Sequence, residues 1–442
     1  MNEEPKKLFN RDYLLLWQGQ SVSRIGNQAF AVGMLYWILE KTGSATLMGT
    51  LAALAAIPGV LLGPIAGTIA DRHSRKAIIV GTDLVNGLAV TAFALFMLYY
   101  PASLRLQLTL LFAVSIFLAT TTTFFRPAIS AALPELVPKD RLTTANSLGQ
   151  LSRQITVLVG QGAGGVIYAI LGAPILFLID GLSFLFSAFS EVFIRIPQHI
   201  PEKSKSLSEE FQKFKEGMRV GLHYVWQTRG IRTMMFASSF LAFLTAPVLI
   251  LLPVFVRRYL NAGPEAYGFL LAAYGLGTML GYVLAGVLGL QGRVRARVLI
   301  VLMFAEAGSY AVLGLMRSVP PALGFAVVGG ALDGFVIVNL TTILQLTTPS
   351  EIRGRVFGLL GTISSGLAPI GMGLAGVVAD LVHQNIPLIY ISVSALMALL
   401  ILAAASDSHF REYLAYRAEP RTRRRGPEPE AVPVEMVDGR IL

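Results

Sequence analysis

Charged side chains are sparse in this chain, and six of them interrupt long apolar stretches. Of its 442 residues, 54% are hydrophobic and only 14% are charged. A charged group at the centre of a membrane-spanning helix costs roughly 2.5 to 3.5 kcal/mol on insertion scales, so it persists only with a partner or a function. The functions open to such groups are proton binding, ion pairing and contact with polar cargo. The six are Arg24, Arg126, Arg153, Asp180, Glu306 and Asp333.

Arg24 lies in the most polar of these stretches. Gln20, Asn27 and Gln28 stand three or four residues from it, so they share a helical face that is too polar for lipid. This face predicts the wall of a water-filled cavity, and a static ion pair at Arg24 is the alternative. Arg153 belongs to a second polar stripe, which should face the groove between two groups of helices.

Asp333 is the best candidate for a group that gains and loses a proton, with a permanent ion pair as the alternative. Arg126 either faces a cavity or marks an interface, because Pro127 and Pro134 suggest that its helix ends there. Two further acids, Asp180 and Glu306, are expected to be structural. Glu40 and Asp380 lie near outer helix ends and are expected to be solvated or to snorkel toward the membrane surface.

Twelve apolar windows, broken by short polar turns, account for most of the chain. Each is close to the roughly 20 residues that cross about 30 Å of hydrocarbon, and the mean hydropathy of +0.64 is far outside the range of soluble domains. We therefore predict an all-α membrane protein with twelve transmembrane helices and both termini on one side. The windows are 13–40, 47–70, 77–100, 106–128, 143–171, 174–196, 231–258, 265–290, 297–318, 321–345, 354–382 and 385–405.

Lysine and arginine gather in the loops on one side of these windows. Short cytoplasmic loops accumulate these residues, so we expect both termini to be cytoplasmic. The chain is then expected to be an integral protein of the plasma membrane of a prokaryote. The net charge of +10 is then mainly an orientation signal. It also favours contact with anionic membrane lipids, and nucleic acid is not an expected partner. The loops expected outside hold only Lys41, Arg105, Arg257, Arg258 and Arg317.

Residue sets typical of soluble enzymes are missing from the sequence. The chain has no cysteine, which excludes disulfides and thiol catalysis. It has no Gly-rich phosphate loop ending in Lys and Ser or Thr, and its five histidines are scattered without the spacing of metal ligands. We expect no enzyme activity, no metal site and no cofactor.

The longest polar insertion, residues 197–230, divides the chain into two halves. It should be a cytoplasmic linker that contains an amphipathic helix on the membrane surface. The bundles it separates are 13–196 and 231–405, flanked by a cytoplasmic N-terminus of 1–12 and a tail of 406–442 that should be disordered. A weak repeat at an offset of 211 aligns Gly162 with Gly373 and Gly165 with Gly376.

A compact charged turn follows the second apolar window. Asp71 stands near the C-terminal end of a helix, where the helix dipole makes a carboxylate unfavourable unless a cation compensates it. Local cations could supply this partner, and Asp83 could hold one of them in turn. The alternative is an ordinary charged turn that only sets topology. The turn comprises Gly67, Asp71, Arg72, Arg75 and Lys76.

These five residues match a loop motif of the major facilitator superfamily, and the chain resembles that superfamily over nearly its whole length. The resemblance implies two pseudo-symmetric bundles of six helices. It also implies that Asp71 bridges to the start of the eleventh helix, at Arg353 or Arg355, and locks the outward-facing state. Ser74 stands where the family usually has glycine.

Two further stretches sharpen the resemblance. Residues 160–165 are similar to an antiporter signature, which implies helix flexibility at Gly160, Gly162, Gly164 and Gly165, and plain close packing is the alternative. Residues 23–27 and 124–148 resemble a prokaryotic branch of drug/proton antiporters that includes macrolide and enterobactin exporters. In that superfamily the first, fourth, seventh and tenth helices line the cavity, which favours Arg24, Arg126 and Asp333. Asn27 stands where many relatives carry aspartate.

The function implied is export of an amphipathic small molecule by alternating access, with protons as the coupled partner. Membrane lipids are the other expected partner, and the resemblance implies a monomer. A lipid or lysophospholipid transporter on the same fold is one alternative. A non-transporting membrane receptor or scaffold is the other, and it would place the function in the tail and the linker.

Overall fold

The structure, a computed structural model, describes residues 8–100, 103–197 and 207–417. These residues are helical almost throughout and contain no strand, which confirms the all-α prediction. The helices before the linker are α1 (Arg11–Thr42), α2 (Ala45–Arg72), α3 (Arg75–Tyr99), α4 (Leu104–Leu136) and α5 (Leu142–Val192). The later ones are α6 (Leu207–Gln227), α7 (Arg229–Ile250), α8 (Leu252–Arg258), α9 (Pro264–Leu288), α10 (Gly292–Leu315), α11 (Val319–Thr347), α12 (Ser350–Leu381), α13 (Ile386–Ser406) and α14 (Ser408–Leu414).

Serine side chains start several of these helices. The Oγ atoms of Ser44, Ser74 and Ser103 each accept a hydrogen bond from the backbone N–H three residues later, at the starts of α2, α3 and α4. Such caps satisfy one of the free donors of a helix N-terminus. The short connections of the N-terminal half are therefore fixed by their own side chains.

Ten helices of the described chain are long and apolar enough to cross a membrane. The predicted count of twelve is not confirmed by this criterion, for two reasons. The polar side chains of α1 lower its hydropathy, so it is not among the ten. The second reason is that α5, with 51 residues, covers two of the predicted windows but is counted as one helix.

Helix α5 reverses direction at Gly172, where φ is 76° and ψ is 173°. A straight helix of its length would span roughly 77 Å, more than twice the membrane core. Gly164 packs on Ala29 of α1 before the kink, whereas Asp180 and Ser183 reach Gly26 after it. The two segments therefore pass α1 in opposite directions, and they correspond to the predicted windows 143–171 and 174–196.

Replacing Gly172 with alanine should destabilise the protein by on the order of 1 to 3 kcal/mol, because only glycine adopts this backbone conformation without strain. Steric crowding is not the reason, since an added Cβ would be 3.8 Å from the Pro174 ring. Thermal unfolding in detergent measures the effect. Gly308→Ala is the control, because its Cβ would meet open space inside α10 and the change should be neutral or stabilising. Equal melting temperatures for the two variants would contradict the assignment of strain to Gly172.

Helix α4 continues through both of its prolines. An end at Pro127 is excluded, since the helix extends to Leu136, and this end lies two residues after Pro134. Proline removes a backbone donor, and neighbouring groups can satisfy the carbonyls that are freed. Arg75 donates from Nη1 to the Ala131 carbonyl oxygen at 3.0 Å, which lies between the two prolines and is not one of the carbonyls that they free, those of Thr123 and Ser130.

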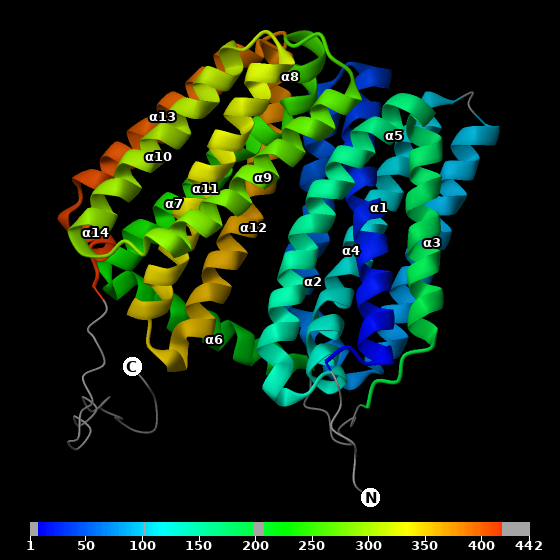
Figure 1. Ribbon diagram of the computed structural model, residues 1–442, viewed down its shortest axis with the longest axis horizontal. Helices are drawn as coiled ribbons and strands as arrows, with labels where there is room; N and C mark the ends of the chain where they lie inside the picture. Colours follow the sequence, from blue (N-terminus) through cyan, green and yellow to red (C-terminus); the bar gives the residue numbers. More distant parts are fainter. Residues whose placement is uncertain (1–7, 101–102, 198–206, 418–442) are drawn as a thin grey trace, which may run out of the picture.

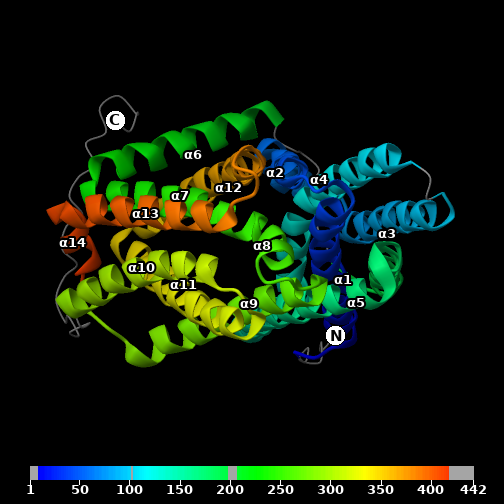
Figure 2. The same ribbon diagram turned by 90° about the horizontal axis from the view of Figure 1, so that it is seen from above.

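The two halves form separate groups of helices. Figure 1 shows α1 to α5 on one side and α7 to α13 on the other, with α6 near the end where the described chain begins and α8 at the opposite end. Figure 2 shows the same groups from above, with α6 alongside α7. The helix expected in the linker is thus present as α6.

The weak internal repeat has a structural counterpart. Gly165 of α5 packs across the halves on the Pro264 carbonyl oxygen and on Gly268 of α9. Gly376 of α12, its partner at the offset of 211, packs across the halves on the Ala45 carbonyl oxygen of α2. Equivalent glycines therefore support equivalent helix pairs, α5 with α9 and α12 with α2.

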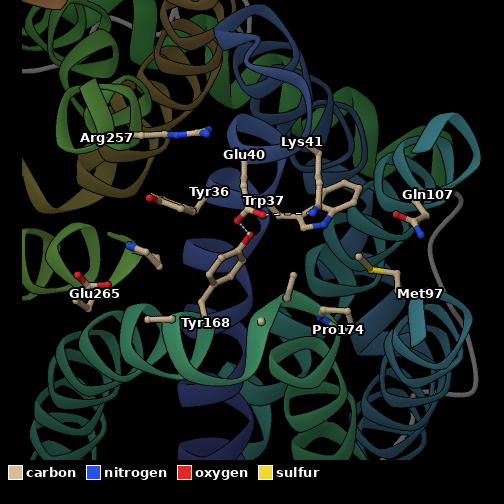
Figure 3. Close-up of a pocket in the computed structure, with 14 residues that line it drawn as sticks. Tyr36, Trp37, Glu40, Lys41, Met97, Gln107, Tyr168, Pro174, Arg257 and Glu265 are labelled. Atoms are coloured by element: carbon tan, nitrogen blue, oxygen red, sulfur yellow. Dashed lines mark hydrogen bonds and ion pairs between the residues drawn. The ribbon is translucent and has the colours of Figure 1, made fainter. Parts of the chain in front are cut away.

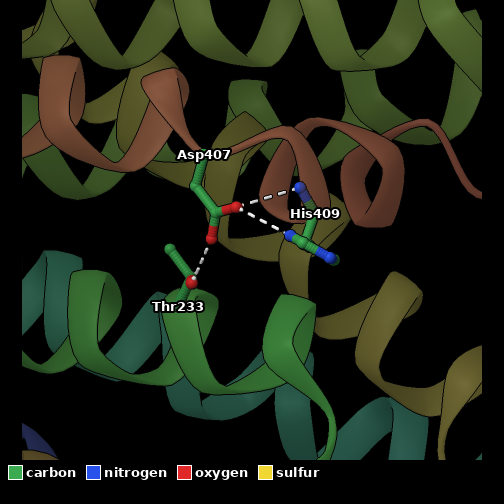
Figure 4. Close-up of polar contacts among 3 residues, drawn as sticks. All are labelled: Thr233, Asp407 and His409. Carbon is green, nitrogen blue, oxygen red and sulfur yellow. Dashed lines mark hydrogen bonds and ion pairs between the residues drawn. The ribbon is translucent and has the colours of Figure 1, made fainter.

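The start of the tail is ordered, so the prediction of disorder from residue 406 is wrong for α14. Asp407 accepts hydrogen bonds from Thr233 Oγ1 at 2.7 Å and from the backbone N–H and Nδ1 of His409 (Figure 4). The bond from Thr233 is the main cause that holds the pKa of Asp407 below its usual value. These bonds fasten α14 to α7, and the tail from 418 to 442 lies outside the described residues.

Candidate functional site

The two halves meet most closely at one end of the molecule. There a Cβ added to Gly49 of α2 would collide with the Met372 carbonyl oxygen of α12, and one on Gly376 would collide with that of Ala45. We call this end, formed by residues 43–53 and 372–384, the closed end, and the opposite end the open end. Toward the open end, added Cβ atoms would meet open space at Gly63, Gly67, Gly358 and Gly361.

The cations predicted to line a cavity lie on the N-terminal half. Arg24 is partly exposed and lies within electrostatic range of Arg126 and Arg153, both of which are exposed. Asn27 and Arg126 line one cavity of about 510 Å³ between α1, α2 and α4. Gln28 contacts Gln161 of α5 at 3.5 Å between Oε1 and Nε2. The structure thus places Asn27 of α1 and Arg126 of α4 on one cavity, and it places Gln28 of α1 beside Gln161 of α5.

A buried carboxyl network lies behind Arg24. The Gln20 side-chain amide donates to Asp83 Oδ2 at 3.3 Å and to Glu191 Oε1 at 2.7 Å. Asp83 is 2% exposed and Glu191 is fully buried, and both lie within electrostatic range of Arg24. Asp83 had been expected beside the charged turn, and its described hydrogen bond is from α1. Sequence reasoning missed Glu191, although a glutamate within the window 174–196 was a visible signal.

Asp180 adds a third carboxyl to this region. It is fully buried, and neither of its carboxylate oxygens has a hydrogen-bond partner among the described residues. Arg24 supplies one positive charge against three possible negative charges. Burial of unpaired charge is very costly, so three ionised carboxylates beside one cation would be unfavourable here.

A second carboxyl pair lies in the C-terminal half. Glu306 of α10 is buried and accepts a hydrogen bond from the Tyr310 hydroxyl at 3.3 Å. Asp333 of α11 lies within electrostatic range of Glu306 and of Tyr274 of α9. The neighbours found for Asp333 are thus tyrosines and another acid, rather than the cation of a permanent ion pair.

The charged turn is compact without a glycine. Ser74, which departs from the family motif, has φ of −56° and caps α3, so its position does not require the left-handed conformation that favours glycine. The side chain of Asp71 lies outside the described part of the chain, so its bridge to α12 stays a prediction. Arg353 donates to the Thr348 carbonyl oxygen at 3.2 Å, and Arg355 lies against Gly217 and Gly221 of α6.

The glycine stretch of α5 is a packing surface. Added Cβ atoms on Gly160 and Gly164 would press on the α1 backbone at Ile25 and Ala29. Gly165 faces α9, whereas a Cβ on Gly162 would make only an ordinary 3.6 Å contact with Ala272 of α9. These positions are helical, and flexibility at them stays a prediction.

The closed end carries a cavity of about 660 Å³ with an aromatic floor (Figure 3). Tyr168 donates from its hydroxyl to Glu40 Oε2 at 2.7 Å, and Lys41 pairs with Glu40 Oε1 at 3.3 Å. Figure 3 places Arg257 and Glu265 of the other half across the cavity from these residues. Glu40 is therefore partly solvated, as expected, but it also has two partners. The described residues contain no group of three or more His, Asp or Glu side chains that could hold a metal ion.

Comparison with known proteins covers nearly the whole chain. A family model described as a transmembrane secretion effector matches residues 7–442. Macrolide efflux protein A of Streptococcus pyogenes is 28% identical over 383 residues, which are 84% of this chain and 90% of that protein. The multidrug efflux pump Tap of Mycolicibacterium fortuitum is 25% identical over 80% of this chain and 86% of its own length. A bacterial homologue of the human lysosomal transporter Spinster, solved in an inward-facing and unoccupied conformation, matches with a TM-score of 0.66 at 15% identity, over 91% of this chain and 96% of its own.

Proposed function

Since the chain belongs to the transmembrane secretion effector family of the major facilitator superfamily and is an efflux transporter of the bacterial membrane, we propose that it exports amphipathic drugs of the macrolide type. Export proceeds by alternating access and is driven by inward proton flow. The observation that carries the choice of cargo is the similarity to macrolide efflux protein A over 84% of the chain.

The geometry of the two halves supports alternating access. The halves touch through backbone atoms at the closed end, whereas added Cβ atoms on α2 and α12 toward the open end would meet no other atom within 4 Å. Two rigid bundles with such a contact can rock about it. The lysines and arginines near the open end support a cytoplasmic location for it, so this state is inward-facing in our proposal.

The arrangement of polar groups supports a division of labour between the halves. Arg24, Asn27, Gln28, Arg126 and Arg153 contact cargo from the N-terminal half. The acids Asp333 and Glu306 exchange protons in the C-terminal half, where tyrosines rather than cations surround them. The buried trio of Asp83, Asp180 and Glu191 is a second place where protons are held.

Transport in reconstituted vesicles tests the proposal. With the protein in liposomes, an imposed proton gradient should drive accumulation of a macrolide, and the macrolide should in turn move protons across the membrane. Dyes, siderophores and lysolipids complete the panel, and protein-free liposomes are the control. The absence of proton movement with every compound would refute antiport, while macrolide movement without protons would leave only the export.

Lipid-like cargo is the second candidate, and one cavity favours it. Residues of α2 and α12 line an apolar space of about 350 Å³ at the seam between the halves. Its walls include the exposed side chains of Ile57, Leu61 and Ile370, which lipid tails could reach from the membrane. Selective movement of the lysolipids in the same panel would support this candidate. A receptor without transport is disfavoured, because the named relatives are efflux proteins.

A further inference from the structure

Asp380 joins the two halves at the closed end. It lies in the last turn of α12, and its carboxylate accepts three hydrogen bonds from the start of α2 in the other half. Ser44 Oγ and the Thr46 backbone N–H donate to Oδ2 at 2.9 and 2.8 Å, and the Ala45 N–H donates to Oδ1 at 3.1 Å. Asp380 is therefore partly exposed, and it also has hydrogen-bond partners in the other half that its sequence position did not predict.

The direction of the two helices explains why this contact is favourable. A carboxylate near the C-terminal end of its own helix is destabilised by the negative end of that helix dipole. The N-terminal end of α2 offers the opposite partial charge and backbone donors that no intrahelical carbonyl can satisfy. The contact with the N-terminal end of α2 therefore offsets the unfavourable position of Asp380 at the end of α12. This stabilisation exists only while the halves are in contact.

Gln384 completes the connection. Its side-chain amide donates to Asp380 Oδ1 at 2.8 Å and to the Gly43 carbonyl oxygen at 2.6 Å, so one group of the C-terminal half holds both the acid and the α1–α2 turn. Thr46 Oγ1 also donates to the Gly376 carbonyl oxygen at 3.3 Å. Parting of α2 from α12 would break together every one of these bonds that crosses between the halves, while the bond from Gln384 to Asp380 lies within the C-terminal half and would remain.

The neighbouring acid at the same end behaves differently. Glu40 bonds to Tyr168 and Lys41, which both belong to its own half. Removal of its charge leaves the contacts between the halves in place. Glu40 therefore offers a matched control for Asp380.

We propose that Asp380 is the latch that holds the closed end shut and sets the balance between the two states of the transport cycle. Gln384 positions its carboxylate. This inference rests on the alternating access proposed above. It also implies a reciprocal pair, because α2 and α12 are antiparallel. Asp380 at the end of α12 secures the start of α2 in one state, and Asp71 at the end of α2 secures the start of α12 in the other.

Distance measurements between spin labels test the latch directly. The chain has no cysteine, so pairs of cysteines can be introduced without background labelling. Tyr99 and Ser318 are exposed sites on the two halves at the closed end, and Arg141 and Arg293 are exposed sites at the other end. Electron–electron distance distributions of each pair, recorded without drug or gradient, give the populations of the two states.

In this measurement Asp380→Asn should raise the ratio of opened to closed molecules at the closed end at least tenfold. The distance between labels at the other end should shorten in the same molecules. Glu40→Gln should leave both distributions unchanged, and Asp380→Glu should restore part of the closed population. A distribution for Asp380→Asn that equals the wild type would overturn the latch.

A second variant guards against loss of folding. If Asp380→Asn does not yield monodisperse protein, Gln384→Leu decides the question, because it removes the positioning amide and keeps the carboxylate. It should shift the ratio in the same direction by a smaller factor, and no shift would overturn the inference. The test distinguishes failure of the latch from failure of the proposed cargo. A shifted ratio in a protein that transports no macrolide would refute the cargo alone. If the wild type and all of the variants showed the same single state, both alternating access and the latch would be refuted.

Discussion

Asp71→Asn should lower the initial rate of drug efflux at least tenfold while the protein remains folded and inserted. The acid lies in the last turn of α2, and in our proposal it reaches the start of α12 when the open end closes. Asparagine keeps the size of the side chain but lacks the charge that the helix N-terminus and the arginines attract. Efflux from cells or vesicles measures the rate, normalised to the amount of protein in the membrane.

The matched control for this variant is Asp140→Asn. Asp140 is exposed, pairs with Arg141 at 3.5 Å, and belongs to the next turn at the same end of the molecule. Its substitution should leave efflux within about twofold of wild type, because an exposed pair contributes little. Normal efflux by Asp71→Asn would remove the locking role. A shift of its spin-label distances opposite to that of Asp380→Asn would support the reciprocal pair.

Asp333→Asn should abolish efflux against a concentration gradient and leave exchange of drug between the two sides of the membrane intact. A group that carries a proton through the cycle is needed only when the proton gradient does work. The side chains found around Asp333 are tyrosines and Glu306, so asparagine can take its place without leaving a cation unpaired. The expected loss of proton-driven accumulation is at least tenfold.

Three measurements separate this outcome from general damage. Counterflow of labelled drug without a proton gradient should stay near the wild-type rate. Asp333→Glu, which keeps a titratable acid, should retain part of the driven transport, and Glu412→Gln on the exposed surface of α14 should retain all of it. If Asp333→Asn still accumulates drug fully, the coupling belongs elsewhere, and Glu191→Gln becomes the next variant to measure.

The sequence allowed the fold class and the helices to be predicted because apolar length and polar turns act locally. It did not reveal that Pro127 and Pro134 lie inside α4, since a helix tolerates proline when neighbours satisfy the freed carbonyls. Disorder was also predicted from residue 406, although α14 is helical. The bond between Asp407 and Thr233 that holds this helix depends on packing of α14 on α7, and the sequence does not show that packing.

The site was predictable in its residue types and less so in its partners. Arg24 and Arg126 were identified from polarity within apolar windows, and they lie on α1 and α4 of the same half. The partners of Asp83, Glu191 and Asp380 come from helices that are distant in the chain, namely α1 and α2. Contacts of this kind depend on how the helices pack in the bundles. The spacing of residues along one helix carries no information about that packing.

Small residues let the backbones of α2 and α12, and those of α5 and α9, touch each other. These contacts restrict how the range of transported drugs can change. Substitutions at Gly49, Gly165, Gly268 or Gly376 would force the backbones apart, so variation there is constrained whatever the drug. The walls around Asn27 and Arg126 border open volume instead. In our proposal, resistance to a new compound can therefore arise by exchange of wall side chains, while the helix contacts that transport of every compound requires stay the same.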